Sequence, residues 1–417
     1  DWSPDGKDLA IIRYVEGRLR LEFPIGKVLY QGGDIGGPRF SPRGDLIVFQ
    51  DDHGTIKVIG SSGGPVRTLT TGWVPFGGGA PCWTPDGKEV WFSAAAEPGA
   101  PEALHAVDLD GKVRLVAQVP GFLELDDISR DGRALFAHHT ISYRMWGLAP
   151  GETVERDLTW LDRSIPAALS ADGKTILFSE TGEAGGKTSS VYVRKMDGSP
   201  AVRLGEGEGI ALSSDGAWVL VTYANDPQRM TLLPTGVGET KSLPASGFEA
   251  IRGGVFHPDG SRVIFTGRER GRGWGIYSIP ASGGSPRRIA PEGVTIPAPV
   301  TRALSLDGRW VLGGSGPGTL TRYPLQEGEP RRVTGIEMTD WPIGWNADGL
   351  LFVSSETLGA ALVHLVDPDS GRRTLWKKIP LDPGSSVERI VISADGRSYV
   401  YSTRRVHSQL YVVEGLK

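Results

Sequence analysis

Five short stretches of the sequence combine residue types that could do chemistry. Gly60-Ser61-Ser62-Gly63-Gly64 has the spacing of a nucleophile elbow, in which a serine attacks a carbonyl group. Residues 182–188 approach the pattern of a phosphate-binding loop. His138-His139 and Asp51-Asp52-His53-Gly54 offer groups that could hold a metal ion, and residues 108–111 begin like a calcium loop. Each stretch needs a particular local structure before it can act.

Local structure argues against catalysis at the first two stretches. A nucleophile elbow requires a strained turn from a strand into a helix, whereas Ser62-Gly63-Gly64 matches Ser282-Gly283-Gly284 and predicts a hairpin turn. In residues 182–188, Thr181 stands where a phosphate loop needs its first glycine, and no helix is predicted to follow. We therefore expect a hairpin turn in the first case and a loop between two strands in the second.

The other three stretches also have a simpler structural interpretation. Adjacent residues of a strand point to opposite faces, so His138 and His139 are poorly placed to bind one ion. The acidic stretch at residues 51–54 is typical of a turn between strands, and residues 108–111 lack the remaining ligands of a calcium loop. We expect no catalytic residue, no cofactor site and no metal site in this chain.

A repeated turn provides the elements that would position any site. Pro258-Asp259-Gly260 lies between two short apolar runs, and its residue types suit a bulged hairpin with Gly260 at positive φ. Similar turns recur at intervals of 38 to 48 residues, and a period of about 40 to 45 residues is typical of propeller blades. The ten turns are Asp5-Gly6, Arg43-Gly44, Asp86-Gly87, Asp131-Gly132, Asp172-Gly173, Asp215-Gly216, Asp259-Gly260, Asp307-Gly308, Asp348-Gly349 and Asp395-Gly396.

Each repeat predicts four strands, A to D, with the repeated turn joining A to B. In the seventh repeat these are Gly254–Phe256, Arg262–Thr266, Trp274–Ile279 and Pro286–Ile289. The B strands are nearly continuous apolar runs, as expected in the middle of a sheet that is packed on both faces. The predicted fold class is therefore all-β, a β-propeller of ten four-stranded blade repeats.

Ten blades exceed the usual four to eight of one ring, so we expect two rings. The tenth repeat has no strand D, and Glu152–Trp160 is predicted to pair with Leu410–Val413 and close a six-bladed ring. The predicted domains are residues 1–151, four blades of a ring whose other blades lie upstream, and residues 152–417. The alternative is one large ten-bladed ring, in which Glu152–Trp160 ends the fourth blade beside Met145–Leu148.

Composition excludes some classes of function. The net charge is −4, so no basic surface for nucleic acid is expected. No apolar run approaches the ~20 residues of a membrane span, so this chain is not expected to insert into a membrane by itself. Cys82 is the single cysteine, so no intrachain disulfide is possible, and its apolar neighbours predict a buried, unreactive thiol.

The repeated Ser3-Pro4-Asp5-Gly6 motif and its variants resemble TolB-like repeats over the whole chain. More narrowly, residues 20–30, residues 197–207 and the C-terminal stretches 401–405 and 410–417 resemble the C-terminal repeat region of bacterial eukaryotic-type serine/threonine protein kinases. Such kinases have a cytoplasmic kinase domain, one membrane helix and repeats outside the membrane. The resemblance implies an extracytoplasmic chain on the periplasmic side, tethered through an upstream membrane helix.

The chain contains no His-Arg-Asp loop, no Asp-Phe-Gly motif and no glycine-rich nucleotide loop, so we expect no enzyme activity. The predicted function is a non-catalytic propeller that binds an unknown protein, peptide or small molecule as the sensor region of a receptor-like kinase. One alternative is a TolB-like periplasmic scaffold of the cell envelope. The other is the propeller domain of a prolyl-oligopeptidase-type hydrolase without its catalytic domain.

The predicted binding face is the one formed by the loops between strands B and C and between strands D and A. These loops vary among the repeats and carry aromatic and arginine side chains, which often anchor interfaces. Packing between blades is the alternative role for each aromatic residue. The candidates are Trp73, Phe76, Phe122, Trp160, Arg163, Arg268, Arg270, Arg272, Glu337, Asp340, Trp341, Arg404 and Arg405.

Overall fold

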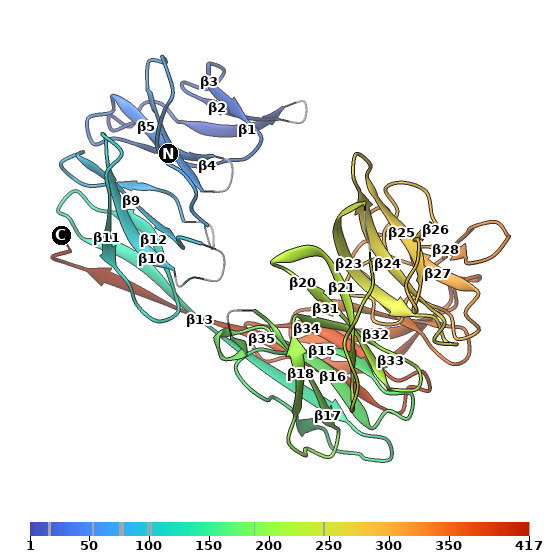
Figure 1. Ribbon diagram of the computed structural model, residues 1–417. Coiled ribbons are helices and arrows are strands. Elements are labelled where there is room, and N and C mark those ends of the chain that lie inside the picture. The colour runs from blue at the N-terminus through green and yellow to red at the C-terminus, as the bar shows by residue number, and fades with distance from the viewer. Residues whose placement is uncertain are drawn as a thin grey trace. The chain divides into compact units, whose positions relative to one another are not determined.

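A computed structural model describes residues 1–15, 18–51, 54–74, 79–97, 100, 102–186, 188–244 and 247–416. In these residues the chain is all-β, with mostly antiparallel strand pairs and one short 3-10 helix, η1 (Glu183–Gly185) (Figure 1). The chain forms two compact units. Unit 1 comprises residues 1–141 and 406–417, and unit 2 comprises residues 142–405.

Unit 1 contains three sheets of its own, in the strand orders β1-β2-β3, β4-β5-β6-β7 and β11-β10-β9-β8. The strands are β1 (Ile11–Val15), β2 (Arg18–Glu22), β3 (Val28–Gly32), β4 (Ile35–Phe40), β5 (Leu46–Asp51), β6 (Thr55–Gly60), β7 (Arg67–Thr70), β8 (Cys82–Trp83), β9 (Glu89–Ala94), β10 (Ala103–Asp108), β11 (Val113–Ala117) and β12 (Phe122–Ile128).

Unit 2 contains the sheets β15-β16-β17-β18, β19-β20-β21-β22, β23-β24-β25-β26, β27-β28-β29 and β30-β31-β32-β33. The strands are β14 (Arg156–Asp157), β15 (Ser164–Leu169), β16 (Thr175–Glu180), β17 (Ser190–Lys195), β18 (Val202–Glu206), β19 (Glu208–Leu212), β20 (Trp218–Tyr223), β21 (Asp226–Pro234), β22 (Lys241–Ser242), β23 (Phe248–Phe256), β24 (Arg262–Glu269), β25 (Trp274–Pro280), β26 (Arg287–Arg288), β27 (Trp310–Gly313), β28 (Thr321–Pro324), β29 (Arg331–Arg332), β30 (Trp341–Trp345), β31 (Leu351–Thr357), β32 (Ala360–Val366), β33 (Arg373–Pro380) and β34 (Ser385–Ile392).

Two long strands contain the boundaries between the units. β13 (Ala134–Leu148) and β35 (Tyr399–Val413) belong to a sheet of order β12-β13-β35-β34, and β14 pairs with β13. The first half of β13 pairs with β12 in unit 1, and its second half pairs with β14 in unit 2. The first half of β35 pairs with β34 in unit 2.

The repeated turns have the predicted geometry. Gly260 has a φ of +73°, and the glycines of all ten turns have φ between +67° and +84°. A carboxylate stabilises most of these turns, as at Asp172, whose Oδ1 accepts hydrogen bonds from Ser170 Oγ and Lys174 N. The four strands predicted for the seventh repeat correspond to β23, β24, β25 and β26, so the prediction of four strands in this repeat is confirmed.

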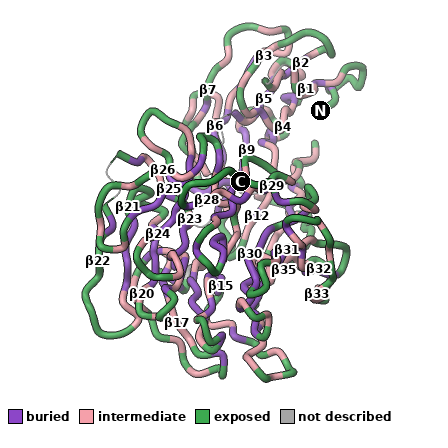
Figure 2. Tube along the Cα trace, turned by 90° about the vertical axis from the view of Figure 1, so that its right-hand side faces the viewer, coloured by how far each residue is buried: buried purple, intermediate pink, exposed green. Residues whose placement is uncertain are grey.

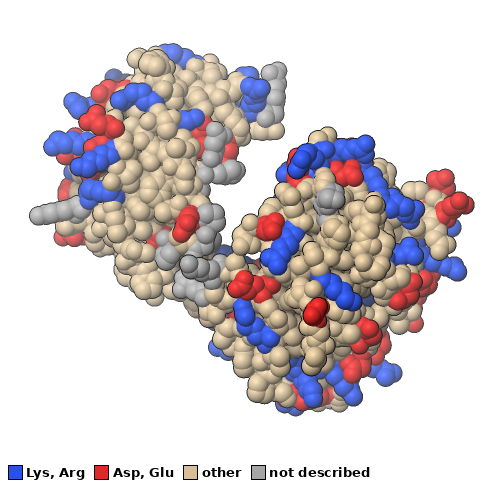
Figure 3. All heavy atoms as spheres, in the orientation of Figure 1, with Lys and Arg blue, Asp and Glu red and all other residues tan. Residues whose placement is uncertain are grey.

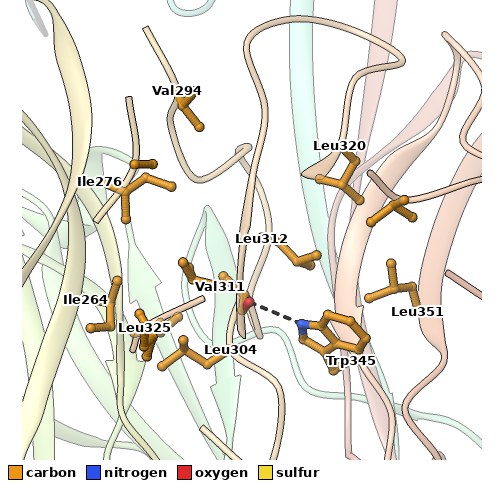
Figure 4. Close-up of a cluster of buried hydrophobic side chains, with 14 of the residues drawn as sticks. Ile264, Ile276, Val294, Leu304, Val311, Leu312, Leu320, Leu325, Trp345 and Leu351 are labelled. Carbon is orange, nitrogen blue, oxygen red and sulfur yellow. Dashed lines mark hydrogen bonds between the residues drawn. The ribbon is translucent and has the colours of Figure 1, made fainter. Parts of the chain in front are cut away.

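The cores of unit 2 lie between successive sheets. Leu177 and Val219 belong to a cluster between the sheets that begin with β15 and β19, and Leu220 packs with Phe265 between the next two. A further cluster joins β24, β27 and β31, and its Trp345 donates a hydrogen bond from Nε1 to Ala303 O (Figure 4). Buried stretches run along the strands, while the turns are exposed (Figure 2). Such stacking of antiparallel sheets is that of a β-propeller.

The remaining clusters of unit 2 involve the strands from the two ends of its sequence. Phe352 of β31 packs in a cluster with Tyr399 of β35 and with Trp146 of β13. On the other side, Val400 of β35 packs with Phe178 of β16. The sheet that contains β34, the first half of β35 and the second half of β13 therefore lies between the sheets of β30–β33 and β15–β18.

The predicted pairing of residues 152–160 with residues 410–413 is wrong. Asp157 and Arg156 of β14 lie opposite Trp146 and Gly147 of β13, and Leu158 N donates a hydrogen bond to Met145 O over 2.7 Å. The physical reason is the short connection from β13 to β14, because closing a short loop costs less entropy than a distant pairing. The observed pairing is the one given for the alternative of a single ten-bladed ring. Because β13 runs from unit 1 into unit 2, however, this pairing does not by itself establish the number of rings.

Candidate functional site

The two stretches that approach catalytic motifs adopt the expected turn and loop. Residues 60–64 connect β6 to β7, and Gly63 N donates to Gly60 O over 2.9 Å, which closes a hairpin turn. Residues 182–188 connect β16 to β17 and contain only the one-turn η1, with Lys187 outside the described residues. Neither stretch leads into a helix that could orient a nucleophile or bind a phosphate.

The adjacent histidines are engaged in separate contacts. His138 Nε2 lies 2.7 Å from Pro120 O, whereas His139 lies 3.1 Å from Glu124 Oε2 and 2.8 Å from Ser408 Oγ. Within the described part of the chain, no three His, Cys, Asp or Glu side chains come together in a way that could hold a metal ion.

The acidic stretches are likewise occupied by local contacts. Asp51 is buried and accepts hydrogen bonds from Tyr30 Oη, over 2.5 Å, and from Lys57 Nζ, while Asp52 and His53 lie outside the described residues. Asp108 Oδ1 accepts from the backbone N–H groups of residues 110 and 112, which forms a turn. These carboxylates stabilise the local structure.

The candidates in unit 1 pack against its sheets. Trp73 is half-buried, lies 5.2 Å from Phe92 and 4.3 Å from His105 between ring centroids, and donates from Nε1 to Thr70 Oγ1. Phe122 begins β12 and is half-buried. Phe76 lies outside the described residues.

Trp160 and Arg163 of unit 2 are both half-buried. Trp160 is half-buried against the cluster of Met145 and Phe178, and the Arg194 guanidinium lies 5.5 Å from its ring centroid. The Arg163 guanidinium lies 4.6 Å from the ring centroid of Tyr143. Both contacts are cation–π interactions, which fix the orientation of these side chains.

Four of the other five arginine candidates lie within 4.0 Å of a carboxylate. Arg268 lies 3.1 Å from Glu249, and Arg272 lies 3.5 Å from Glu269, while Arg270 is exposed. Arg404 lies 4.0 Å from Glu388, and Arg405 lies 3.7 Å from Asp382. On the face seen in Figure 3, basic and acidic side chains are interspersed.

The three candidates at residues 337–341 differ in their surroundings. Asp340 is buried and forms a bidentate pair with Arg373, with distances of 2.5 and 2.9 Å. Glu337 is exposed, 3.7 Å from Arg373. Trp341 is 56% exposed and lines a cavity, so it is the candidate that the structure places at a concave surface.

Two cavities lie between the A strands of unit 2. A cavity of about 390 Å³ contains Trp341, Pro342 and Glu388, and one of about 700 Å³ contains Glu208, Arg252 and Trp274. Pro299 and Arg389 line both, so the two cavities adjoin one another. Their walls combine the starts of A strands with the ends of B strands, and they therefore open at the face of the B–C and D–A loops. Each has the size of an ordinary ligand site.

A bulge recurs in these A strands. The register shifts between Pro166 and Ala168 in β15, and equivalent shifts occur in β19, β23, β30 and β34. A bulge re-aims side chains, and bulges often lie beside functional sites. The cavity walls are formed at this level of the sheets.

Sequence reasoning missed Arg389, Arg252, Glu208 and Trp274, yet a signal for Arg389 exists. It lies seven residues before the repeat glycine Gly396. The same position in the other repeats of unit 2 has Pro166, Gly209, Gly253, Thr301 and Pro342, all small or uncharged. A charged side chain at a position that is otherwise neutral marks a departure from the structural repeat.

Arg389 is half-buried, and its Nε atom is enclosed without a hydrogen-bond partner among the described residues. Burial lowers the pKa of its guanidinium below the ordinary value, while the negative charges of Glu208 and Glu388 oppose this change. The site can therefore offer charge-assisted hydrogen bonds to an acceptor that enters the cavity.

Comparisons with known proteins give distant similarities. No family model matches the chain. Over 212 residues it is 27% identical to the uncharacterized peptidase YuxL of Bacillus subtilis (strain 168). The aligned region covers 46% of this chain and 31% of that protein. The chain thus spans less than a third of the length of this relative. No helix in the described residues is long and apolar enough to cross a membrane.

Several solved structures are also similar to the chain. It is similar to TolB of Acinetobacter baumannii, with 13% identity, a TM-score of 0.30 and coverage of 90% of this chain and 66% of that one. It is similar to a chain of a nidogen/laminin complex, with 14% identity, a TM-score of 0.43 and coverage of 57% and 94%. Oligogalacturonate lyase of Vibrio parahaemolyticus gives 15% identity, a TM-score of 0.29 and coverage of 66% and 87%.

Proposed function

We propose that the chain is a non-catalytic binding region whose ligand enters the adjoining cavities of unit 2. The observation that supports this most directly is the shared wall of Pro299 and Arg389 between two cavities of about 390 and 700 Å³. The cavities combine aromatic and proline walls with a few charged groups, which is the usual composition of a ligand site.

This proposal includes a ring arrangement. Unit 2 is a six-bladed ring, in which β34 and the first half of β35 combine with the second half of β13 and β14 as the last blade. The contacts of Val400 with Phe178 and of Tyr399 with Phe352 support this closure, because they link that blade to both neighbours. Unit 1 contributes four blades of a separate propeller.

We further propose that the chain is the extracytoplasmic sensor region of a receptor-like bacterial serine/threonine kinase. Support comes from the stretches at residues 20–30, 197–207 and 401–417 that resemble such kinases. Sequencing the gene tests this directly: the coding sequence upstream of Asp1 should encode a kinase domain followed by one membrane helix. A reporter fused after Lys417 should then be active on the periplasmic side.

A second candidate is the propeller domain of a peptidase, which the similarity to YuxL favours. The gene would then encode a hydrolase domain beside the propeller. A TolB-like envelope scaffold is the third candidate, and its gene would encode a signal peptide before the propeller with neither catalytic domain. The three candidates therefore differ in one observation, the coding sequence that adjoins this chain.

Site-directed labelling tests the binding site. Ser386 lines the smaller cavity, whereas exposed Ser282 lies in the turn between β25 and β26, so Ser386→Cys and Ser282→Cys form a matched pair. Members of a library of dipeptides and monosaccharides that bind the wild-type protein should no longer bind Ser386→Cys after labelling with a bulky maleimide. They should still bind labelled Ser282→Cys. Binding that survives at labelled Ser386→Cys would place the site elsewhere.

The purified chain should turn over neither ATP nor an ester or peptide substrate, because the two stretches that approach catalytic motifs form a hairpin turn and a loop and lead into no helix. The measurement is phosphate release from ATP and hydrolysis of p-nitrophenyl esters and peptide anilides. An activity that a point change in this chain abolishes would overturn the non-catalytic assignment.

A further inference from the structure

Arg389 has donors that the folded protein does not use. Its side chain forms no hydrogen bond and no ion pair with any described residue, although it lines both cavities and its Nε is enclosed. A guanidinium has five N–H donors, and leaving a buried donor without an acceptor costs free energy. The Arg389 side chain therefore lies at the cavity wall with N–H donors that have no acceptor among the described residues.

Arg302 provides a contrast within the same unit. Its Nη2 donates to Ile392 O over 2.7 Å and its Nη1 donates to Trp345 O over 3.3 Å, so its donors bind backbone carbonyl groups. Arg302 thus links strands as a structural residue. Arg389, with no such acceptors, has no equivalent structural contact.

The other charges in the cavities limit the charge of a ligand. Arg252 stacks on Trp274, with 4.5 Å from its guanidinium carbon to the ring centroid. Glu208, Glu356 and Glu388 bring three negative charges to the walls, against two positive charges of Arg252 and Arg389. Arg404 lies 4.0 Å from Glu388 and offsets part of its charge. A doubly charged phosphate would be repelled by the glutamates, whereas a singly charged carboxylate is repelled less.

We propose that Arg389 binds the carboxylate of a ligand in these cavities. The planar guanidinium can donate two parallel hydrogen bonds to a carboxylate, and Trp274, Trp341 and Pro299 provide apolar walls for the rest of the molecule. A free peptide C-terminus and a small organic acid share this chemistry. The proposal specifies the ligand class of the proposed binding site and depends on that site.

Direct titration of the 417-residue chain tests the proposal. The probes are acetyl-trialanine with a free carboxylate, acetyl-trialanine amide, acetate and inorganic phosphate, measured by calorimetry and by thermal shift. The free acid should bind at least about tenfold more tightly than the amide, because the amide loses the charge-assisted pair. Tighter binding of the peptide acid than of acetate indicates a peptide end, and equal binding indicates a small acid.

Substitutions test whether Arg389 causes the preference for the acid over the amide. Arg389→Gln should reduce the affinity for the peptide acid to that for the amide, whereas Arg309→Gln, at an exposed turn between strands A and B, should leave it unchanged. If Arg389→Gln does not fold, the wild-type thermal shift still decides, since at equal concentration the peptide acid should raise the melting temperature more than the amide does. Equal binding of acid and amide, tighter binding of phosphate, or no binding of the acid at millimolar concentration overturns the proposal.

These results distinguish a wrong ligand class from a wrong binding site. If acid and amide bind equally, and the Ser386→Cys label blocks both, the cavity remains the binding site and only the carboxylate preference is wrong. If the label blocks neither, the site itself is wrong.

Discussion

Gly260 and Gly308 have the same backbone conformation in different surroundings. Their φ values are +73° and +69°, a region that β-branched residues rarely adopt. A Cβ atom added to Gly260 would meet nothing within 4 Å, whereas one added to Gly308 would lie 2.4 Å from His257 Nε2. The pair therefore separates the conformational cost of a side chain from its steric cost.

Gly260→Val should lower the free energy of unfolding by about 1 kcal/mol or more, through backbone strain alone. Gly308→Val should cost more, because the His257 ring must also move. Urea denaturation followed by tryptophan fluorescence measures both. Gly260→Asn is the control, since asparagine tolerates positive φ and should cost less than valine.

The Cys82 thiol should be unreactive in the folded protein. Its sulfur is buried and lies 3.4 Å from Ala80 O, and burial raises the pKa of the thiol from 9.0 to about 12. An aromatic disulfide reagent at pH 8 should label no thiol in the native protein and one in urea. Between pH 9.0 and about 12 the unfolded chain releases the thiol proton while the folded protein keeps it. The free energy of unfolding of the wild-type protein should therefore fall, relative to that of Cys82→Ala, as the pH rises through this range. Rapid native labelling would contradict its burial.

At the scale of the element, β14 depends on a carboxylate beside it. Glu155, which precedes β14, accepts hydrogen bonds from Tyr399 Oη over 2.5 Å and from Tyr401 Oη over 2.8 Å. Both tyrosines are buried, and burial together with the Glu155 charge raises the pKa of both hydroxyls. Glu155 thereby joins the connection between β13 and β14 to β35.

Glu155→Ala should lower the free energy of unfolding by about 2 kcal/mol or more, since two buried hydroxyls lose their acceptor. Glu152→Ala is the matched control in the same connection, because Glu152 pairs with Arg156 at the exposed surface and should change stability little. Chemical denaturation of the two variants gives the comparison. Equal effects would mean that the Glu155 contacts contribute no more than a surface pair.

The sequence predicted the elements that local chemistry determines. Pro258-Asp259-Gly260 predicted both the turn and the positive φ, and short apolar runs together with the turns between them predicted β23 to β26. It did not predict that β13 and β35 each run on for 15 residues, because nothing in their residue types marks where one sheet ends and another begins. Of the residues that line the cavities, Trp341 was predicted, whereas Arg389 was missed because its surroundings depend on the bulge and on neighbours far away in sequence.

At the scale of the whole molecule, unit 2 depends on strands from both ends of its sequence. Gly147 of β13 lies at this junction. A Cβ atom there would lie 2.6 Å from Leu158, 2.9 Å from Met196 and 3.1 Å from Val400. These side chains belong to the cluster that joins the closing sheet to the sheet of β15–β18. The close approach of the strands at this point requires a residue without a side chain.

Gly147→Val should therefore destabilise unit 2 by about 1–3 kcal/mol, because a well-packed core accepts additional methyl groups only by distortion. Hydrogen exchange measured by mass spectrometry should show faster exchange in β15 to β17 and in β34, while β5 and β6 of unit 1 keep their protection. Gly236→Val is the control, since a Cβ atom at Gly236 meets nothing within 4 Å. If Gly147→Val loosens β5 and β6 as much as β16, the two units unfold as one, and the closing sheet does not define an independent ring.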